Sequence, residues 1–354
     1  MRIWIELSGE NPALARAEAD RALHAVGGAL ADASEDDPVP EPHFLAAEVP
    51  GPGEAQELAL RLALAHRLLV PWAERGVEPL RARVESEARG RPGGLSIEWL
   101  AGGAVPPPGR REGLREELAK AHRRGGGTIR PAAPSRRFYL SGNDAPGLRL
   151  HELLARVDRA AYGRRRMPSM PFQRPVSLPP RRARAAVNLA GVAPGRRIAD
   201  PFVGTGALLL EAGLLGGRLF GSDRDPEMIR GALRNLGAFG IEAEGLSVDD
   251  AEEAARSLPW PQVDAVVTDP PYGRASSTGG EGVRELIARV LPAWAERVAP
   301  GGCIVLIGPD GPDPLPPPWR ATISVADRVH RSLTRQFRVY ERTAPAGGEP
   351  PGRT

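Results

Sequence analysis

The second half of the chain, from residue 181 onward, alternates short apolar runs with longer amphipathic segments. Apolar runs of this length, bounded by glycine or polar residues, predict buried strands. Strict alternation of strand and helix predicts one mostly parallel sheet with helices on both faces. We therefore expect an α/β, doubly wound domain at 181–345 that ends in an antiparallel hairpin. The expected strands lie at 198–202, 219–222, 245–248, 263–268 and 303–307, and those of the hairpin at 321–326 and 336–341.

The first half of the chain has a different pattern and predicts two smaller domains. Residues 1–75 favour a ferredoxin-like α+β domain, and residues 76–165 favour a second small α/β module. Five prolines between residues 166 and 180 predict a linker, and 346–354 is expected to be a flexible tail. We expect a fragment without residues 1–165 to fold by itself. The expected elements are strands at 1–7, 43–49, 80–84, 95–100 and 137–140, and helices at 12–26, 54–70 and 112–124.

Basic residues are concentrated in one segment of the chain. Residues 110–184 contain 18 arginines and one lysine against six acids, a net charge of +13 in a chain whose total is +3. A genome rich in G and C would raise arginine throughout the chain, but it would not remove acids from one segment. Segregation of this size predicts binding to a polyanion such as a nucleic acid.

Composition also bounds the compartment and the metal content. The chain has one cysteine, Cys303, and no run of 18 apolar residues, so we expect neither an internal disulfide nor a transmembrane helix. The N-terminus alternates like a strand and lacks a signal-peptide pattern. We therefore expect a cytoplasmic protein that does not bind a membrane. The six histidines are scattered, so no metal site is expected.

A glycine-containing turn follows the first strand of the α/β domain. It reads Asp-Pro-Phe-Val-Gly-Thr-Gly over residues 200–206. Gly204 and Gly206 allow a ligand to approach the backbone closely. Asp200, at the end of the strand, can accept a hydrogen bond from an amine or a hydroxyl. We expect this turn to bind a cofactor, with Phe202 and Thr205 among the contacts.

Acids also end the next two strands of this domain. Asp223 lies 19 residues after Gly204, close to the spacing at which an acid binds a ribose diol. One acid of the pair Asp249 and Asp250, for which we favour Asp250, could accept from the amino group of adenine, although both could equally cap a helix. The turn offers Asp200 where a dinucleotide site needs positive charge, and it lacks the Gly-Lys-Ser/Thr of a nucleoside triphosphate site. These features predict S-adenosylmethionine, which carries a cationic centre and an ammonium group.

The tetrapeptide Asp269-Pro270-Pro271-Tyr272 directly follows the strand at 263–268. A planar amine fits such a corner, because Asp269 and the Pro270 carbonyl accept its N–H groups while Tyr272 stacks on its ring. Holding the amine in line with a methyl donor supplies much of the catalysis. A tight turn that only ends the strand is the alternative. We predict methyl transfer to the exocyclic amine of a base, with residues 269–272 as the catalytic corner.

Six motifs give the chain a family resemblance, and they lie at 6–11, 174–189, 200–206, 221–223, 268–274 and 330–335. Through these motifs the chain resembles the archaeal THUMP-domain tRNA (guanine-10-N2) methyltransferases and dimethyltransferases. The resemblance implies a class I (Rossmann-like) S-adenosylmethionine methyltransferase domain and a THUMP-like tRNA-binding module at 76–165. It also implies N2-methylation of a guanosine in tRNA, at position 10, once or twice. We expect a monomer, or an enzyme assisted by a small zinc-ribbon activator subunit as in some relatives.

Basic side chains in the basic segment and near the terminal hairpin are the candidate contacts to RNA phosphates. The motif at 330–335 could also be no more than a solvated connection between two strands. The candidate RNA-binding residues are Arg130, Arg164, Arg165, Arg174, His330, Arg331 and Arg335.

Three other interpretations stay open at this point. The chain could act on guanine N2 of rRNA, or on adenine N6 or cytosine N4 of DNA, or it could be a catalytically idle RNA-binding protein. The presence of Asp200, Asp223 and Asp269 argues against an idle protein. A DNA enzyme would need an insert for target recognition, and no segment of suitable size is found.

Overall fold

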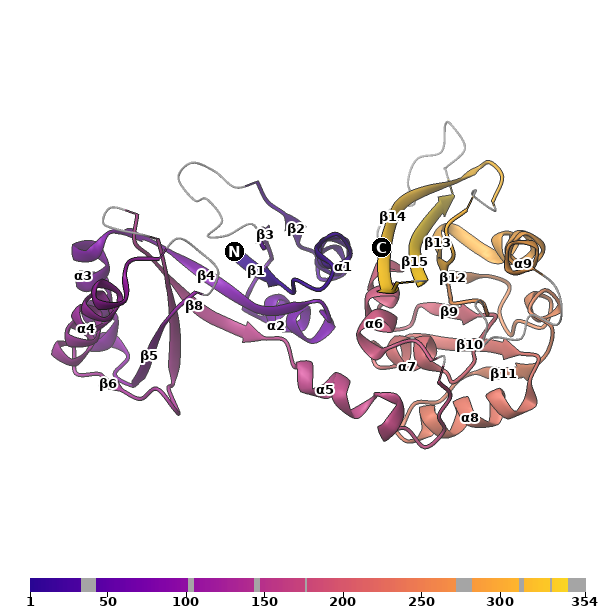
Figure 1. The fold of residues 1–354 in the computed structure, drawn as a ribbon, viewed down its shortest axis with the longest axis horizontal. Helices are drawn as coiled ribbons and strands as arrows, with labels where there is room; N and C mark the ends of the chain where they lie inside the picture. Colours follow the sequence, from indigo (N-terminus) through magenta and orange to yellow (C-terminus); the bar gives the residue numbers. More distant parts are fainter. Residues whose placement is uncertain are drawn as a thin grey trace. The chain divides into compact units, whose positions relative to one another are not determined.

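The computed structural model describes residues 1–32, 43–100, 105–142, 147–175, 177–271, 282–311, 315–331 and 333–342. The chain forms two compact units, of which unit 2 takes two short pieces from the N-terminal part of the sequence (Figure 1). Among the helices of the described residues, none combines the length and the apolar character needed to cross a membrane. Unit 1 comprises Met1–Gly9, Val26–Leu60 and Ala65–Val157, and unit 2 comprises Glu10–Ala25, Arg61–Leu64 and Asp158–Thr354.

Unit 1 contains an eight-stranded sheet in the order β2-β3-β1-β4-β8-β7-β5-β6. Strand β8 pairs with both β4 and β7, so the strands on either side of residue 75 belong to one sheet. The expected domain boundary at 75/76 therefore falls inside this unit. Its strands are β1 (Arg2–Leu7), β2 (Ala29–Leu30), β3 (Phe44–Glu48), β4 (Ala65–Arg75), β5 (Gly94–Trp99), β6 (Thr128–Ile129), β7 (Arg136–Ser141) and β8 (Arg149–Arg156), and its helices are α2 (Pro52–Arg61), α3 (Val77–Gly90) and α4 (Pro108–Arg124).

Two expected elements of unit 1 are wrong. The helix expected at 54–70 ends at Arg61, and β4 begins at Ala65. A continuous apolar run such as this suits a helix or a buried strand, and pairing with β1 and β8 decides for the strand. The strand expected at 80–84 is part of α3, because Leu80, Val84 and Ala88 recur at helical spacing and are buried.

Unit 2 contains a seven-stranded sheet in the order β11-β10-β9-β12-β13-β15-β14. The first five strands of that order are parallel, and β15 is antiparallel to both of its neighbours, which confirms the predicted fold class. The strands are β9 (Arg197–Asp200), β10 (Arg218–Asp223), β11 (Gly245–Val248), β12 (Val263–Thr268), β13 (Val298–Gly308), β14 (Trp319–His330) and β15 (Leu333–Arg342), and the helices are α1 (Pro12–Ala25), α5 (Arg159–Arg164), α6 (Pro180–Leu189), α7 (Ala207–Gly213), α8 (Pro226–Gly237) and α9 (Val283–Arg297), with two short 3-10 helices, η1 (Met167–Ser169) and η2 (Glu253–Ala255).

The carboxyl ends of β9, β10, β11 and β12 lie at one edge of this sheet, which we call the carboxyl edge. Strands β9 and β12 are neighbours in the sheet although β10 and β11 separate them in the sequence. Such a reversal of strand order leaves a crevice at the strand ends, where open α/β sheets bind their ligands. The hairpin of β14 and β15 turns at the same edge, because Gly308, at the end of β13, pairs with Gln336 near the start of β15.

The segment expected to be a linker, 166–180, is packed onto unit 2 over its described residues. Met170, Phe172 and Leu178 are buried. The ring of Phe172 lies against α8 at Gly231, where an added Cβ would come within 2.0 Å of it. The prolines of this segment predicted an irregular backbone, but its apolar side chains pack against unit 2 and hold it in place. The expected tail at 346–354 lies outside the described residues.

Candidate active site at the carboxyl edge

Asp200 is the last residue of β9, and its side chain is buried. Its Oδ1 accepts hydrogen bonds from the Phe202 amide at 3.0 Å and from the Thr268 hydroxyl at 2.8 Å. Burial raises the pKa of Asp200 to about 7; these hydrogen bonds oppose that rise, and the charges of Asp269 and Asp223 add to it. The Thr268 bond joins the ends of β9 and β12 and places the predicted cofactor acid beside the predicted catalytic corner.

Asp223 ends β10 and connects it to the glycine turn. Its Oδ2 accepts from the Gly204 amide at 2.9 Å, and its Oδ1 accepts from the Asp225 amide at 3.0 Å. Burial raises the pKa of Asp223, partly offset by these two backbone hydrogen bonds. A carboxylate has about four lone-pair positions, so both oxygens keep capacity for further donors such as the hydroxyls of a ribose.

The glycine turn leaves space for a ligand at Gly204. This residue has a φ of 52°, which favours glycine. A Cβ built on it meets only the Phe202 carbonyl oxygen, at 3.9 Å, so a side chain here would fill open space above the turn. Gly221 in β10 has the opposite reason for lacking a side chain. A Cβ there would lie 2.2 Å from Val203 and 3.0 Å from the Asp200 carbonyl oxygen, so only glycine lets the turn pack on the strand.

Thr205 and Phe202 are held from below the turn rather than pointing freely into solvent. The Thr205 hydroxyl lies 2.9 Å from that of Ser177, and its carbonyl accepts from Asn235 at 2.9 Å. Asn235, buried in α8, also exchanges hydrogen bonds with the backbone of Phe172. Phe202 is partly buried and packs against the hydrophobic core that includes Val266 and Leu286. Sequence reasoning missed Asn235, although an amide on the buried face of an amphipathic helix was a usable signal.

Asp250 is already engaged by other groups of the chain. Its Oδ1 accepts from the Glu252 amide at 3.0 Å and from Arg289 at 3.0 Å. The hydrogen bond from Arg289 is the main reason why the pKa of Asp250 is lowered. The bonded amide belongs to Glu252, the N-cap residue of η2, so the Asp250 side chain does not cap this helix. An adenine amino group would have to share the carboxylate with Arg289.

The catalytic corner is described up to its third residue. Asp269 directly follows β12 and is half-buried, Pro270 is buried and Pro271 is half-buried. Tyr272 lies outside the described residues. The register that aligns β12 with β9 and β13 brings Asp269 to the carboxyl edge next to Asp200. Thr268 was not among the predicted site residues, although its position before the corner makes it the link to Asp200.

The candidate RNA-binding residues fall into exposed and buried groups. Arg130, Arg164, His330 and Arg331 are exposed. Arg174 is half-buried, lies over the Phe172 ring and pairs with Glu227 at 2.5 Å.

Arg165 and Arg335 are buried, so we do not retain them as RNA contacts. The guanidinium of Arg165 reaches both oxygens of the buried Glu211, at 2.6 and 3.2 Å, and it stacks on Tyr162. Arg335 is one of five buried residues in β15.

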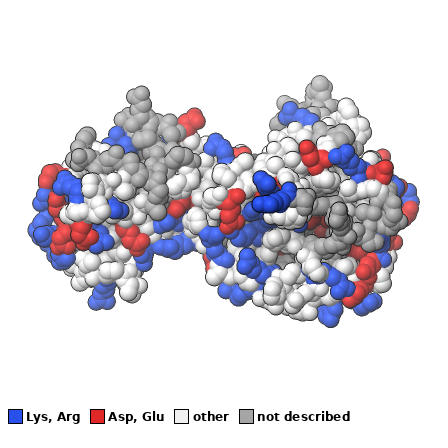
Figure 2. Space-filling view, viewed as in Figure 1, with Lys and Arg blue, Asp and Glu red and all other residues white. Residues whose placement is uncertain are grey.

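The charge segregation seen in the sequence is reduced by folding. Many arginines of the segment 110–184 pair with acids that lie outside it, so Lys and Arg are interspersed with Asp and Glu on the face shown in Figure 2. These pairs are Arg124–Glu85, Arg136–Glu87, Arg137–Glu98, Arg159–Glu10, Arg165–Glu211, Arg174–Glu227, Arg181–Glu10, Arg182–Asp327 and Arg184–Glu211.

Two further features of the described residues bear on ligands. Their His, Cys, Asp and Glu side chains form no cluster of three or more that could hold a metal ion. A cavity of about 440 Å³ in unit 1 is lined by Trp72, Arg83 and Arg136 among others. Two of its arginines are already paired, Arg136 with Glu87 and Glu152 and Arg83 with Glu87.

Comparison with known proteins places this site in a family. The model of the RMKL-like methyltransferase domain matches residues 169–315. A tRNA (guanine(10)-N2)-dimethyltransferase of Methanothermobacter thermautotrophicus is 38% identical over 218 residues, which are 60% of this chain and 61% of that protein. One from Pyrococcus abyssi is 32% identical over 250 residues, 70% of this chain and 69% of that protein.

A solved structure agrees on the fold. The crystal structure of TrmN from Thermus thermophilus superposes with a TM-score of 0.51 at 20% identity, covering 97% of this chain and all of that one. Of the two sequence relatives, the chain spans about three fifths of the protein from Methanothermobacter thermautotrophicus and over two thirds of the protein from Pyrococcus abyssi. Together with the strand order and the glycine turn, these matches show that the chain belongs to the tRNA (guanine(10)-N2)-dimethyltransferase family.

Proposed function

We propose that this protein is an S-adenosylmethionine-dependent tRNA methyltransferase that acts on the N2 amine of guanosine, at position 10. The observation that carries the proposal is the contact between Thr268 and Asp200, which joins the cofactor turn to the catalytic corner at the switch point of the sheet. Family membership supports this substrate. The relative from Pyrococcus abyssi, of which 69% is matched, is named as a tRNA (guanine(10)-N2)-dimethyltransferase.

The residues at the carboxyl edge fit the proposed cofactor. Gly204 leaves open space above the turn, Asp223 keeps acceptor capacity for a ribose, and Asp200 offers a carboxyl group to a cationic ligand. The described part of the turn carries no lysine or arginine, which suits a ligand without phosphate. When bound, S-adenosylmethionine supplies an electrophilic methyl group. Asp250 contributes to adenine binding only if it shares its carboxylate with Arg289.

The catalytic corner orients the guanine amine. Asp269 accepts one N–H of the amine and the Pro270 carbonyl accepts the other, which turns the nitrogen lone pair toward the methyl group. The amine would lose one proton after methylation, and Asp269 would be placed to accept it. Tyr272, which lies outside the described residues, is predicted from the sequence to stack on the base.

Exposed basic residues provide the proposed RNA contacts. Arg130 in unit 1 and Arg164, His330 and Arg331 in unit 2 are available to phosphates, with Arg174 partly so. We propose that residues 76–165 act as the THUMP-like tRNA-binding module, because the segment carries many of the arginines of the basic segment. A tRNA substrate also supports a cytoplasmic location.

Nucleoside mass spectrometry tests the proposal directly. The full chain is incubated with labelled S-adenosylmethionine and unmodified tRNA, and the modified nucleotide is mapped. N2-methylguanosine or N2,N2-dimethylguanosine at position 10 is expected. Parallel reactions with rRNA and DNA separate the alternatives, because label confined to either would replace tRNA as the substrate.

The same assay addresses the remaining partners. Activity of the purified chain alone, at its monomer mass in size-exclusion chromatography, is expected if no activator is needed. Activity that appears only after addition of a zinc-ribbon protein would show that the activator is required.

A further inference from the structure

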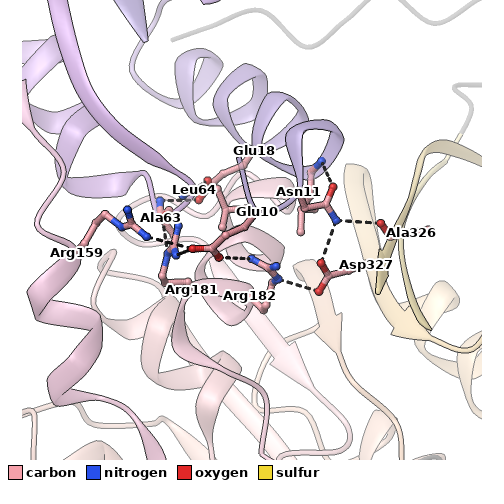
Figure 3. Close-up of polar contacts among 11 residues, drawn as sticks. Glu10, Asn11, Glu18, Ala63, Leu64, Arg159, Arg181, Arg182, Ala326 and Asp327 are labelled. Carbon is pink, nitrogen blue, oxygen red and sulfur yellow. Dashed lines mark hydrogen bonds and ion pairs between the residues drawn. The ribbon is translucent and has the colours of Figure 1, made fainter. Parts of the chain in front are cut away.

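Three segments that are far apart in the sequence meet at one polar cluster in unit 2 (Figure 3). Glu10 and Asn11 precede α1, Arg181 and Arg182 lie in the first turn of α6, and Asp327 lies in β14. The first two pairs belong to motifs that carry the family resemblance and Asp327 lies three residues before a third motif, yet none has a place in the chemistry at the carboxyl edge. Their assembly at a single point calls for a common role.

Asn11 uses both ends of its amide. Its Oδ1 accepts from the Leu14 amide at 3.1 Å, which caps α1. Its Nδ2 donates to Asp327 Oδ1 at 3.0 Å and to the carbonyl oxygen of Ala326 at 2.9 Å. The cap fixes the orientation of the amide, so the N–H groups face β14 and no rearrangement is needed to hold that strand.

Arg182 makes the second connection to the same strand. Its Nε donates to Asp327 Oδ2 at 2.8 Å, and its Nη1 lies 3.5 Å from Glu10 Oε2. Asp327 is buried, and its two carboxylate oxygens accept hydrogen bonds from Asn11 and Arg182. Burial acts against the ionised form of Glu10, but the hydrogen bond and charge of Arg181 and the charges of Arg182 and Arg159 outweigh it and lower its pKa. The cluster is therefore a charge-assisted network in which Asp327 is buried and Glu10 is exposed.

The anchored strand lies at an edge of the sheet. Among the described strands, β14 is last in the sheet order and pairs with β15 on one side. A strand pair at the edge of a sheet twists more freely than the interior strands. Asp327 lies three residues before His330, where β14 ends and the hairpin turns at the carboxyl edge. A hold at Asp327 therefore sets the direction in which the hairpin tip projects.

We propose that Asn11 and Arg182 are positioning residues for the RNA substrate. They hold β14 at Asp327 so that His330 and Arg331 at the hairpin tip face the RNA that enters the carboxyl edge. This inference rests on the proposed function, since it assigns the tip a role in binding the methylated tRNA. None of these residues touches the reacting atoms, so the effect of their loss falls on the tRNA step and leaves cofactor binding intact.

Asn11→Asp is the test variant, with Asn11→Ser as its matched control. Both side chains cap a helix, so α1 is preserved in each. Serine removes the donor to β14, whereas aspartate also places a carboxylate against Asp327. The double variant Asn11→Asp/Asp327→Asn exchanges the two groups and restores an amide–carboxylate hydrogen bond. Steady-state methylation of tRNA by the full chain is measured well below the lowest Tm of the set, with S-adenosylmethionine affinity measured separately.

We expect KM for tRNA to rise about tenfold in Asn11→Asp and less in Asn11→Ser, with kcat and cofactor affinity within about twofold of wild type. The double variant is expected to recover most of the loss. An unchanged KM in Asn11→Asp overturns the inference, and so does a raised KM that the double variant fails to recover. If Asn11→Asp does not fold, Asn11→Ser decides by the same criterion. A wild-type chain without tRNA methylation instead rejects the proposed function, and this inference with it.

Discussion

The side-chain amide of Asn188 lies 2.9 Å from Oε1 of Glu18, a contact that joins α6 to α1 across 170 residues of sequence. Glu18 is fully buried and also accepts hydrogen bonds from the Ala63 and Leu64 amides, at 2.9 and 2.8 Å (Figure 3). Asn188 donates a second bond to the Arg61 carbonyl. One carboxylate thus connects all three pieces of the sequence that build unit 2.

Replacement of Glu18 by alanine is expected to destabilise the protein by about 3–5 kcal/mol, because it leaves three buried N–H donors without their acceptor. Arg16→Ala on the same helix is the control, since its side chain is exposed and about 0.5 kcal/mol or less is expected. Urea unfolding of both variants measures the difference. A loss under about 1 kcal/mol for Glu18→Ala would mean that water replaces these bonds at little cost.

A fragment of residues 158–354 is expected to be much less stable than the same domain within the full chain. This reverses the expectation from sequence that the chain folds without residues 1–165. Removing α1 exposes the face of α6 that it contacts and leaves Asn188 without Glu18. Thermal unfolding and solubility of the fragment provide the measurement. Cooperative unfolding at the temperature of the full chain would show that α1 is dispensable.

Asp269→Asn should lower kcat for tRNA methylation by at least about 100-fold, because the amide no longer accepts the N–H of the guanine amine as a carboxylate does. Cofactor affinity and the overall fold should stay as in wild type, since Asp269 follows β12 at the edge of the sheet. Single-turnover methylation and calorimetric titration with S-adenosylmethionine separate the two effects. Turnover close to that of wild type would remove Asp269 from the catalytic corner.

Cofactor affinity should fall as the pH drops below neutrality. Burial raises the pKa of Asp200 to about 7, so its carboxyl group is ionised above that pH and protonated below it. If a cationic ligand needs the ionised form, its Kd should rise by about tenfold between pH 8 and pH 6. Asp200→Asn, which cannot ionise, is the control and corrects for the titration of the ligand's own amine. Equal pH dependence in both proteins would exclude Asp200 from cation binding.

The raised pKa of Asp200 also makes the stability of the protein depend on pH. The folded state holds a proton on Asp200 at pH values where the unfolded chain, with an ordinary pKa of 3.8, has released it. The unfolding free energy contributed by this group therefore decreases as the pH rises from about 4 to 7.

Two adjacent arginines should respond in opposite ways to alanine substitution. Arg165→Ala is expected to destabilise the protein by about 3–5 kcal/mol, because it removes one of the two buried arginines that balance Glu211. Arg164→Ala should leave stability within about 0.5 kcal/mol, since its side chain is 69% exposed. It should weaken tRNA binding and reduce the slope of log K against log salt by about one. A salt slope lowered by Arg165→Ala instead would reverse this assignment.

The periodicity and turn chemistry of the sequence were enough to determine the α/β domain. Residues 197–342 contain the mostly parallel strands and the antiparallel hairpin that alternation predicted, and the acids expected at strand ends lie at one edge of the sheet. This worked because side-chain burial within a strand and the chemistry of a turn are local properties. The helix expected at 54–70 failed for the corresponding reason, since an apolar run does not reveal its pairing partners.

Only the tertiary structure decided which side chains stabilise the fold and which stay exposed. Arg164 and Arg165 are indistinguishable in sequence, yet one is exposed and the other is buried against Glu211. The net positive charge of the segment 110–184 is reduced by acids up to 171 residues away, as Glu10 is from Arg181. That α1 belongs with α6 follows from Glu18 and Asn188, whose encounter no local pattern records. Two polar groups that are far apart in the sequence pair because each needs a hydrogen-bond partner once it is buried. Which groups are buried together is set by the folded chain and not by the local sequence.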